Sequence, residues 1–230
     1  MGHIVDQPIV ILGGFLIDCR AYVPMKTWLH TRIHSPVEVV KASKLDWFLT
    51  SWEYGWRNLL DRVDKEVQSL QLLSPTGKVT LIGHSSGGVM LRLYLADTQF
   101  AGRTYSGLDK CNFLITLGSP NNAVRATRLR TMVSEKYPGA FFSQSVNYIS
   151  VAGNLDLQSD YATSFSKRFA KSSYKSILNS NDNQNGDGLV PIESALLEGS
   201  NQIVLSNTAH SELFGRSWYG SIDRLNKWFL

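Results

Sequence analysis

The sequence has few cysteines, no long apolar run and no block of like charge, and each absence narrows its class. Its two cysteines, Cys19 and Cys111, are too few for a disulfide scaffold, and neither belongs to a metal-like pair. We therefore expect reduced thiols in a cytoplasmic protein. No apolar stretch reaches the roughly 18 residues of a membrane-spanning helix. The N-terminus also lacks the charged start and apolar core of a secretory leader, so neither a span nor a leader is expected.

The charges are mixed and slightly basic. Lysine and arginine total 23 against 19 acidic residues, for a net charge of +4. Because the basic residues are not clustered, a nucleic-acid partner is not expected. Transient contact with an anionic membrane surface stays open, so the protein is cytoplasmic or peripheral to a membrane. With 43% hydrophobic residues over 230 positions and no linker or repeat, residues 1–230 are predicted to form a single domain.

Short apolar runs alternate with helical patterns along the chain. The predicted strands are 8–15, 37–42, 78–83, 111–120, 146–154 and 201–207, and the predicted helices are 21–32, 53–73, 86–97, 161–178 and 215–230. Strands that are apolar throughout are covered on both faces, and helices between them favour parallel pairing with right-handed crossovers. The sequence thus predicts an α/β fold: a mostly parallel six-stranded sheet with helices on both faces. Ligands bind at the carboxyl ends of such strands.

A serine lies at the corner between the third predicted strand and the helix that follows it. A serine hydroxyl needs a base and an exposed position to act as a nucleophile. Gly83 and Gly87 flank Ser85 at two residues on either side, where a Cβ would collide with the opposite limb of a sharp strand-to-helix turn. Ser86 is the rival nucleophile, but His84 stands two residues before it, where glycine is wanted. We therefore expect Ser85 to be the nucleophile, with a helix-capping serine as the alternative.

The base and its orienting carboxylate should also lie at the carboxyl ends of strands. His210 follows the last predicted strand by a few residues, whereas His84 adjoins the serine and is expected to point away from it. A carboxylate preceding His210 would complete the order Ser, Asp, His. Asp187, between two glycines, is the preferred candidate, and Asp156 near the end of the fifth strand is the second. Together, Ser85, His210 and a carboxylate predict nucleophilic catalysis in which the histidine takes the serine proton.

Two backbone N–H groups are candidates to stabilise the negative oxygen that forms during such a reaction. One is that of Ser86, at the start of a helix, where free N–H groups and the helix dipole favour negative charge. The other is that of Phe15, because Gly13 and Gly14 allow the loop after the first strand to approach. A plain strand-to-helix turn is the alternative explanation for the paired glycines.

Five segments, in order along nearly the whole chain, carry a family resemblance: "IVILGGF", "LIGHSSGG", "TLGSPN", "GDGLVP" and "AHSEL". With them the chain resembles the α/β-hydrolase superfamily, in particular its lipase-like serine esterase branch, and is also similar to inositol-deacylase-like hydrolases. The resemblance implies Ser85, Asp187 and His210 as the triad, Phe15 and Ser86 at the oxyanion hole, and a lid-like insertion, for which 121–145 is the candidate.

The chain also departs from the family pattern. It begins directly at the equivalent of the third strand, and many lipases have His-Gly where this chain has Gly13 and Gly14. Some bacterial lipases hold a calcium ion with a carboxylate just after the catalytic histidine. Glu212 stands there, but no second carboxylate is identified. Neither a metal nor a cofactor is therefore expected.

Two segments bear on the substrate. Five aromatic residues stand within ten positions after the second strand: Trp47, Phe48, Trp52, Tyr54 and Trp56. They are core packing, or else a wall for an acyl chain or a rim that contacts lipid. The basic residues of the insertion are Arg125, Arg128, Arg130 and Lys136, alongside the apolar Met132, Phe141 and Phe142. A solvated cap and a membrane-facing surface both fit this insertion.

The sequence therefore predicts a carboxylic ester hydrolase that acts on a lipid or another apolar acyl ester. Acyl transfer and thioester hydrolysis with the same three residues are the first alternatives. A ligand-binding protein with little turnover is the second, because a fold does not fix a function.

Overall fold

The protein is an open parallel sheet covered by helices, and the computed structural model describes residues 6–124, 126–180 and 184–229 of it. The strands are β1 (Ile9–Leu12), β2 (Val37–Val39), β3 (Val79–His84), β4 (Cys111–Leu117), β5 (Asn147–Asn154) and β6 (Asn201–Ser206). The helices are α1 (Val23–His30), α2 (Lys44–Leu49), α3 (Glu53–Gln71), α4 (Ser86–Leu95), α5 (Arg128–Lys136), α6 (Ser164–Leu178), α7 (Ile192–Ala195) and α8 (Ile222–Trp228). Two short 3-10 helices are η1 (Cys19–Tyr22) and η2 (Gly107–Asp109).

The six strands form one sheet in the order β2-β1-β3-β4-β5-β6, and every neighbouring pair is parallel. The predicted fold class is confirmed, and the sheet is parallel throughout. From β1 the chain first moves outward to β2 and then returns to the other side of β1 for β3. The strand order therefore reverses between β1 and β3, and such a switch point opens a crevice at the carboxyl ends of the two strands.

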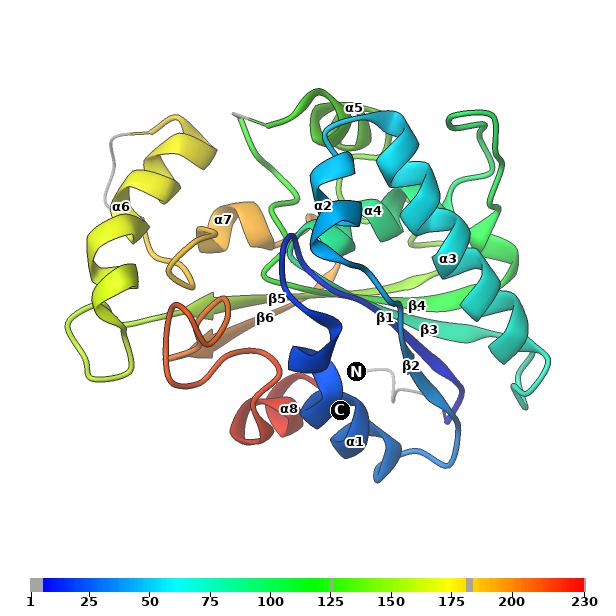
Figure 1. Ribbon diagram of the computed structural model, residues 1–230, viewed down its shortest axis with the longest axis horizontal. Coiled ribbons are helices and arrows are strands. Elements are labelled where there is room, and N and C mark those ends of the chain that lie inside the picture. The colour runs from blue at the N-terminus through cyan, green and yellow to red at the C-terminus, as the bar shows by residue number, and fades with distance from the viewer. Residues whose placement is uncertain (1–5, 125, 181–183, 230) are drawn as a thin grey trace.

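Alternate side chains of each strand enter two apolar layers. In β1, Val10 and Leu12 pack on the side of α3 and α4, while Ile9 and Ile11 pack on the side of α1 and α8. Figure 1 shows α1 and α8 below the sheet and α3 and α4 above it. Because both faces are covered, strands of continuous apolar residues are stable here, as the sequence pattern indicates.

The longest helix, α3, follows the helical spacing of apolar residues in the predicted range 53–73. Leu59, Leu60, Val63 and Val67 of α3 are fully buried against the sheet. Leu73, which the same pattern places on the buried face, is instead 63% exposed, because α3 ends at Gln71 and the chain turns away there. The predicted helical period is therefore correct, but the predicted end at residue 73 lies beyond the observed end of α3 at Gln71.

The C-terminal helix is shorter than its predicted range of 215–230. It begins at Ile222, because the segment before it turns toward the core and is tied to the loop after β6. The N–H of Ala209 donates to the carbonyl of Ser217, and this segment buries Trp218 and Tyr219. Five further elements are absent from the predicted helices: α2, α5, α7 and the two 3-10 helices. Apart from α5, each spans too few residues to show a helical period. In α5 only Leu129 and Val133 are buried, so its apolar pattern is too sparse to indicate a helix.

The insertion at 121–145 contains α5, which lies beside α4 on the upper face of the sheet (Figure 1). Arg125, one of its basic residues, lies outside the described residues. In the part of the chain that the structure describes, no helix is both long and apolar enough to cross a membrane.

Candidate active site

Ser85 occupies a strained corner between β3 and α4. Its backbone has φ 53° and ψ −125°, a conformation that residues other than glycine rarely adopt. The corner is tight enough that a Cβ on Gly83 would strike the backbone of Gly88 across the turn. The need for glycine two residues before the serine thus has the steric cause expected from the sequence.

Gly87 is needed for a different reason from the one expected. A Cβ at this position would not strike the opposite limb of the turn but the carbonyl oxygens of Leu12 and Gly13 at the end of β1. The start of α4 therefore lies directly against β1. This contact brings the loop after β1 close to the serine, which any joint role of the two segments requires.

Asp187 and His210 form a buried hydrogen-bonded pair. His210 Nδ1 lies 2.8 Å from Asp187 Oδ2, and both side chains are almost inaccessible to solvent. Asp187 Oδ1 accepts from the N–H groups of Leu189 and Val190, at 3.0 and 2.7 Å. A carboxylate accepts hydrogen bonds, so His210 Nδ1 is the donor, and no hydrogen bond among the described residues uses its Nε2.

Main-chain hydrogen bonds hold the two loops of this pair together. The N–H of His210 donates to the carbonyl of Asp187 at 2.8 Å. The N–H of Asp187 donates to the carbonyl of Val190 at 3.1 Å. Gly188 closes the turn with φ 98°, which favours glycine. Asp156, the second candidate, is exposed and accepts from the N–H of Gln158 within its own turn. Of the two carboxylates, Asp187 alone contacts His210.

Sequence analysis missed Tyr219, which touches the same carboxylate. Its hydroxyl donates to Asp187 Oδ2 at 2.8 Å and accepts from the N–H of Gly153 at 2.7 Å. Burial, and then the nearby carboxylate, raises the pKa of this phenol well above its usual value, so it remains a donor. Tyr219 was not recognised as part of the site because it falls in the range 215–230 that the sequence predicts as helix.

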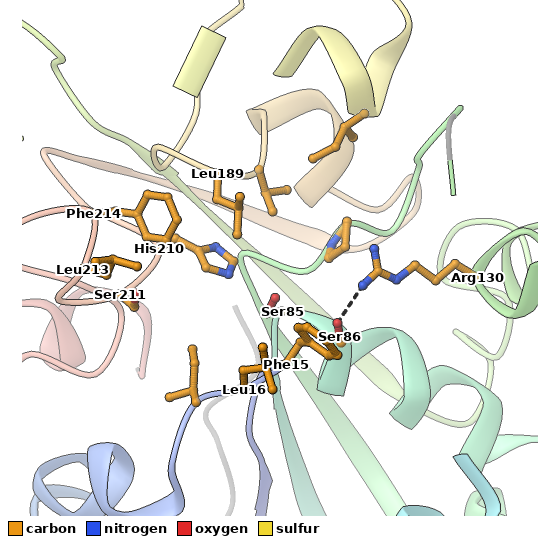
Figure 2. A pocket seen from close by; sticks show the side chains of 14 residues that line it. Phe15, Leu16, Ser85, Ser86, Arg130, Leu189, His210, Ser211, Leu213 and Phe214 are labelled. Carbon is orange, nitrogen blue, oxygen red and sulfur yellow. Dashed lines mark hydrogen bonds between the residues drawn. The ribbon is translucent and has the colours of Figure 1, made fainter. Parts of the chain in front are cut away.

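A cavity of about 500 Å³ brings Ser85 and His210 together. Figure 2 shows the Ser85 hydroxyl and the His210 ring beside each other at this cavity. The hydrogen bonds of the described chain do not include one between the two side chains, and such contacts often tighten only when a ligand binds. The lining is mostly apolar and includes Phe15, Leu16, Ile17, Pro120, Ile177, Leu189, Val190, Leu213 and Phe214.

The two N–H groups expected at an oxyanion hole flank the serine. Phe15 and Ser86 both line the cavity, and no hydrogen bond within the described ranges uses the N–H of either. The preceding N–H, that of Gly14, is occupied because it donates to the Tyr22 hydroxyl at 2.8 Å. The structure thus leaves the groups of Phe15 and Ser86 available to a ligand.

His84 belongs to a buried network below the serine, which its expected orientation away from Ser85 does not reveal. Its Nε2 lies 3.0 Å from the carbonyl of His210, and its Nδ1 lies 2.7 Å from the Tyr22 hydroxyl. Because a carbonyl only accepts, Nε2 is the donor, and in the neutral ring Nδ1 then accepts from the Tyr22 hydroxyl. Burial, and then the neighbouring His210, holds the pKa of His84 well below its usual value. The network ties the backbone of His210 to the Gly14 loop.

A second cavity of about 250 Å³ adjoins the first, and the two share Phe15, Ser86 and Arg130. Its other lining residues are Thr50, Ser51, Trp56, Met90 and Thr127. Arg130, on α5, reaches between the cavities, and its Nη2 donates to Ser86 Oγ at 2.8 Å (Figure 2).

The predicted aromatic cluster divides between interior and surface. Trp47 and Trp56 are buried, and Trp56 lines the second cavity. Phe48, Trp52 and Tyr54 are each more than 60% exposed. Core packing therefore accounts for two of the five, and the other three remain candidates for contact with lipid.

Glu212, the candidate calcium ligand, is an exposed residue. Within the described ranges no group of three or more histidine, cysteine, aspartate or glutamate side chains is arranged to hold a metal ion.

No protein-family model and no curated protein sequence matches this chain. Solved structures similar to parts of it include polyneuridine aldehyde esterase, at 18% identity and a TM-score of 0.37, over 58% of this chain and 49% of that one. Tomato methylketone synthase I, complexed with 2-tridecanone, is similar at 13% identity and a TM-score of 0.37, over 58% of this chain and 48% of that one. An acetylxylan esterase is similar at 16% identity and a TM-score of 0.37, over 52% of this chain and 65% of that one. The matched regions thus span about half to two thirds of those chains.

Proposed function

We propose that the protein is a serine hydrolase that cleaves carboxylic esters, with Ser85 as nucleophile, His210 as base and Asp187 as its orienting carboxylate. The observation that supports this most directly is the shared cavity: a serine on a strained strand-to-helix corner faces a histidine whose other nitrogen is held by a buried carboxylate. Phe15 and Ser86 add two available N–H groups beside that serine.

The proposed reaction proceeds in two halves. The Ser85 oxygen bonds to the ester carbonyl carbon while its proton passes to His210 Nε2, and the N–H groups of Phe15 and Ser86 stabilise the resulting oxyanion. The bond to the alcohol oxygen then breaks, and the alcohol leaves with the proton held by His210. Water attacks the acyl-enzyme in the same way, gives a proton to His210, releases the carboxylic acid and restores Ser85. Asp187 holds the imidazole tautomer and stabilises its charged form.

The lining of the large cavity favours an apolar acyl group. Nine of its residues are apolar, and its volume of about 500 Å³ is within the range of small-molecule sites. We therefore propose a lipid or a similarly apolar ester as the substrate class. In this proposal the segment 121–145 is the lid, because Arg130 of α5 borders both cavities.

Labelling with a fluorophosphonate probe tests the nucleophile. The wild-type protein should be labelled, Ser85→Ala should not, and His210→Ala should be labelled far more slowly. Ser86→Ala removes the rival hydroxyl while keeping its backbone N–H, so this variant should still be labelled. Circular dichroism should show that each variant is folded. Labelling of Ser85→Ala at the wild-type rate would refute the assignment.

The same residues would also serve acyl transfer or thioester hydrolysis. A series of 4-nitrophenyl esters and acyl thioesters, each with and without a competing alcohol, distinguishes these reactions from simple ester hydrolysis. Transfer to the alcohol in preference to water would favour a transferase. Binding of an ester without turnover or labelling would favour a ligand-binding protein.

A further inference from the structure

Arg130 has unused hydrogen-bonding capacity at the edge of the candidate site. A guanidinium has five N–H donors and no acceptor. In the described part of the chain, the Arg130 side chain makes one hydrogen bond, to the hydroxyl of Ser86. Its remaining donors lie at the boundary that the two cavities share, next to the residue whose N–H is available to an oxyanion.

The positive charge of Arg130 is not balanced nearby. No aspartate or glutamate among the described residues lines either cavity or pairs with this arginine. Burial lowers the pKa of Arg130 and no neighbouring group opposes the shift, yet a guanidinium stays charged. A partly buried cation without a partner is costly, and an anion entering the cavity would offset that cost.

Arg92 shows how the same fold treats a purely structural arginine. It is fully buried, and its guanidinium donates to the carbonyls of Asn121 and Tyr137. The main chain therefore supplies its acceptors directly. Arg130 stands only a short distance along the chain from those carbonyls, yet its side chain faces the cavities and not the backbone (Figure 2).

We propose that Arg130 binds an anionic group of the substrate, a carboxylate or a phosphate, so that the natural ester is amphiphilic and negatively charged. This inference rests on the proposed hydrolase function. The apolar lining of the larger cavity would hold the hydrocarbon part, and Arg130 would form charge-assisted hydrogen bonds with the anion at the rim. The N-terminus of α4, which begins at Ser86, adds a favourable field for the same charge.

Two pairs of substrates test this, because the anion could belong to either half of the ester. For the acyl half, the 4-nitrophenyl monoester of glutaric acid is compared with 4-nitrophenyl pentanoate, in which a methyl group replaces the carboxylate. For the alcohol half, a 1-acylglycerol 3-phosphate is compared with the corresponding monoacylglycerol below its aggregation concentration. In at least one pair, wild-type kcat/KM should favour the anionic ester by about tenfold or more, the size of a charge-assisted hydrogen bond.

Substitutions of Arg130 test whether it causes that preference. Arg130→Gln should reduce the anionic-to-neutral ratio of kcat/KM to near one, and Arg130→Lys should retain most of it. Arg128, exposed on the same helix, supplies the matched control: Arg128→Gln should leave the ratio unchanged. If Arg130 only positioned Ser86, Arg130→Gln would slow both esters equally and the unchanged ratio would overturn the inference.

A binding measurement keeps this inference separate from the hydrolase proposal. In Ser85→Ala, which should have no turnover, calorimetry should show octyl phosphate binding about tenfold more tightly than octan-1-ol, and Arg130→Gln should abolish the difference. Equal binding of the two ligands, together with an absence of anionic preference in both substrate pairs, would reject the inference. Normal probe labelling in the same experiments would leave the hydrolase proposal standing.

Discussion

At the scale of single residues, the Asp187 carboxylate is surrounded by donors. Two main-chain N–H groups bind one oxygen, and His210 and the Tyr219 hydroxyl bind the other. Four donors fix the position of this carboxylate. The pair therefore depends on Tyr219 as well as on its own two members.

Tyr219→Phe should weaken this arrangement without breaking it. The variant removes one donor from Asp187 and leaves the buried N–H of Gly153 without its acceptor, so the free energy of unfolding should fall by about 1–3 kcal/mol. Ester hydrolysis should fall several-fold. Tyr174→Phe is the matched control, because that hydroxyl accepts from Gly188 and makes no hydrogen bond with the carboxylate. Urea denaturation and kcat measured for both variants give the comparison, and an equal loss of kcat in the two would count against a specific role for Tyr219.

His84 should make stability depend on pH. Its pKa is depressed in the folded state, so between that pKa and the unfolded value of about 6.5 the unfolded chain binds more protons. Stability should therefore fall as the pH drops below about 6.5, by up to about 1.4 kcal/mol per pH unit for this group. His84→Gln keeps an N–H donor and removes the titration, so its unfolding free energy should vary less with pH over this window. Equal pH profiles for the two proteins would show that His84 does not titrate as stated.

At the scale of elements, the site depends on how closely β1, β3 and α4 approach one another. Ser85 follows β3, the Phe15 loop follows β1, and the two meet where the strand order reverses. Because Gly87 has no side chain, the start of α4 can pack directly against the backbone at the end of β1. The distance between the serine and the Phe15 N–H is therefore set by backbone packing.

Gly87→Ala should be strongly destabilising because the new Cβ would meet backbone oxygens that cannot move aside. We expect a loss of about 2–3 kcal/mol or more, with hydrolysis impaired in the protein that remains folded. Gly77→Ala separates this clash from backbone strain. Gly77 has φ 67° and open space around it, so alanine there should cost only about 1–2 kcal/mol. Thermal unfolding of the two variants makes the comparison, and a smaller loss at position 87 than at 77 would contradict the steric argument.

The sequence was sufficient to predict elements whose pattern repeats within the element itself. The six strands and the long helix α3 appear where their apolar spacing places them. Short helices such as α2 hold too few residues to show a period, and α8 starts late because the segment before it is bonded to the loop after β6. The networks around Tyr22 and Tyr219 join residues far apart in the chain, so no local pattern indicates them. For the same reason Arg130 could be recognised as basic but not placed beside Ser86.

At the scale of the whole molecule, apolar side chains are exposed on the elements that border the two cavities. Phe48 of α2 and Trp52 at the start of α3 lie on either side of Thr50 and Ser51, which line the second cavity. Exposed apolar side chains that gather beside a cavity often mark a surface that binds another molecule or a membrane. As a consequence of the proposed function on a lipid substrate, we expect Phe48 and Trp52 to contact the lipid surface.

Vesicle sedimentation should detect that contact. Replacing Phe48 and Trp52 together by serine should lower the fraction of protein bound to mixed phosphatidylcholine and phosphatidylglycerol vesicles by several-fold, because two large apolar side chains no longer enter the interface. Leu72 and Leu73 are exposed to a similar or greater degree but lie at the other end of α3, so their double serine variant should bind like the wild type. Equal loss in both variants would indicate non-specific adsorption.

The two cavities meet at Phe15, Ser86 and Arg130. A branched ligand, with one group for each cavity and a short linker at the residues they share, would fill both cavities at once. Its second group would bind at the high effective concentration that tethering provides, so affinity could rise far above that of either group alone. Pairs of fragments joined at that corner would therefore be a better starting point for a tight ligand than longer single chains.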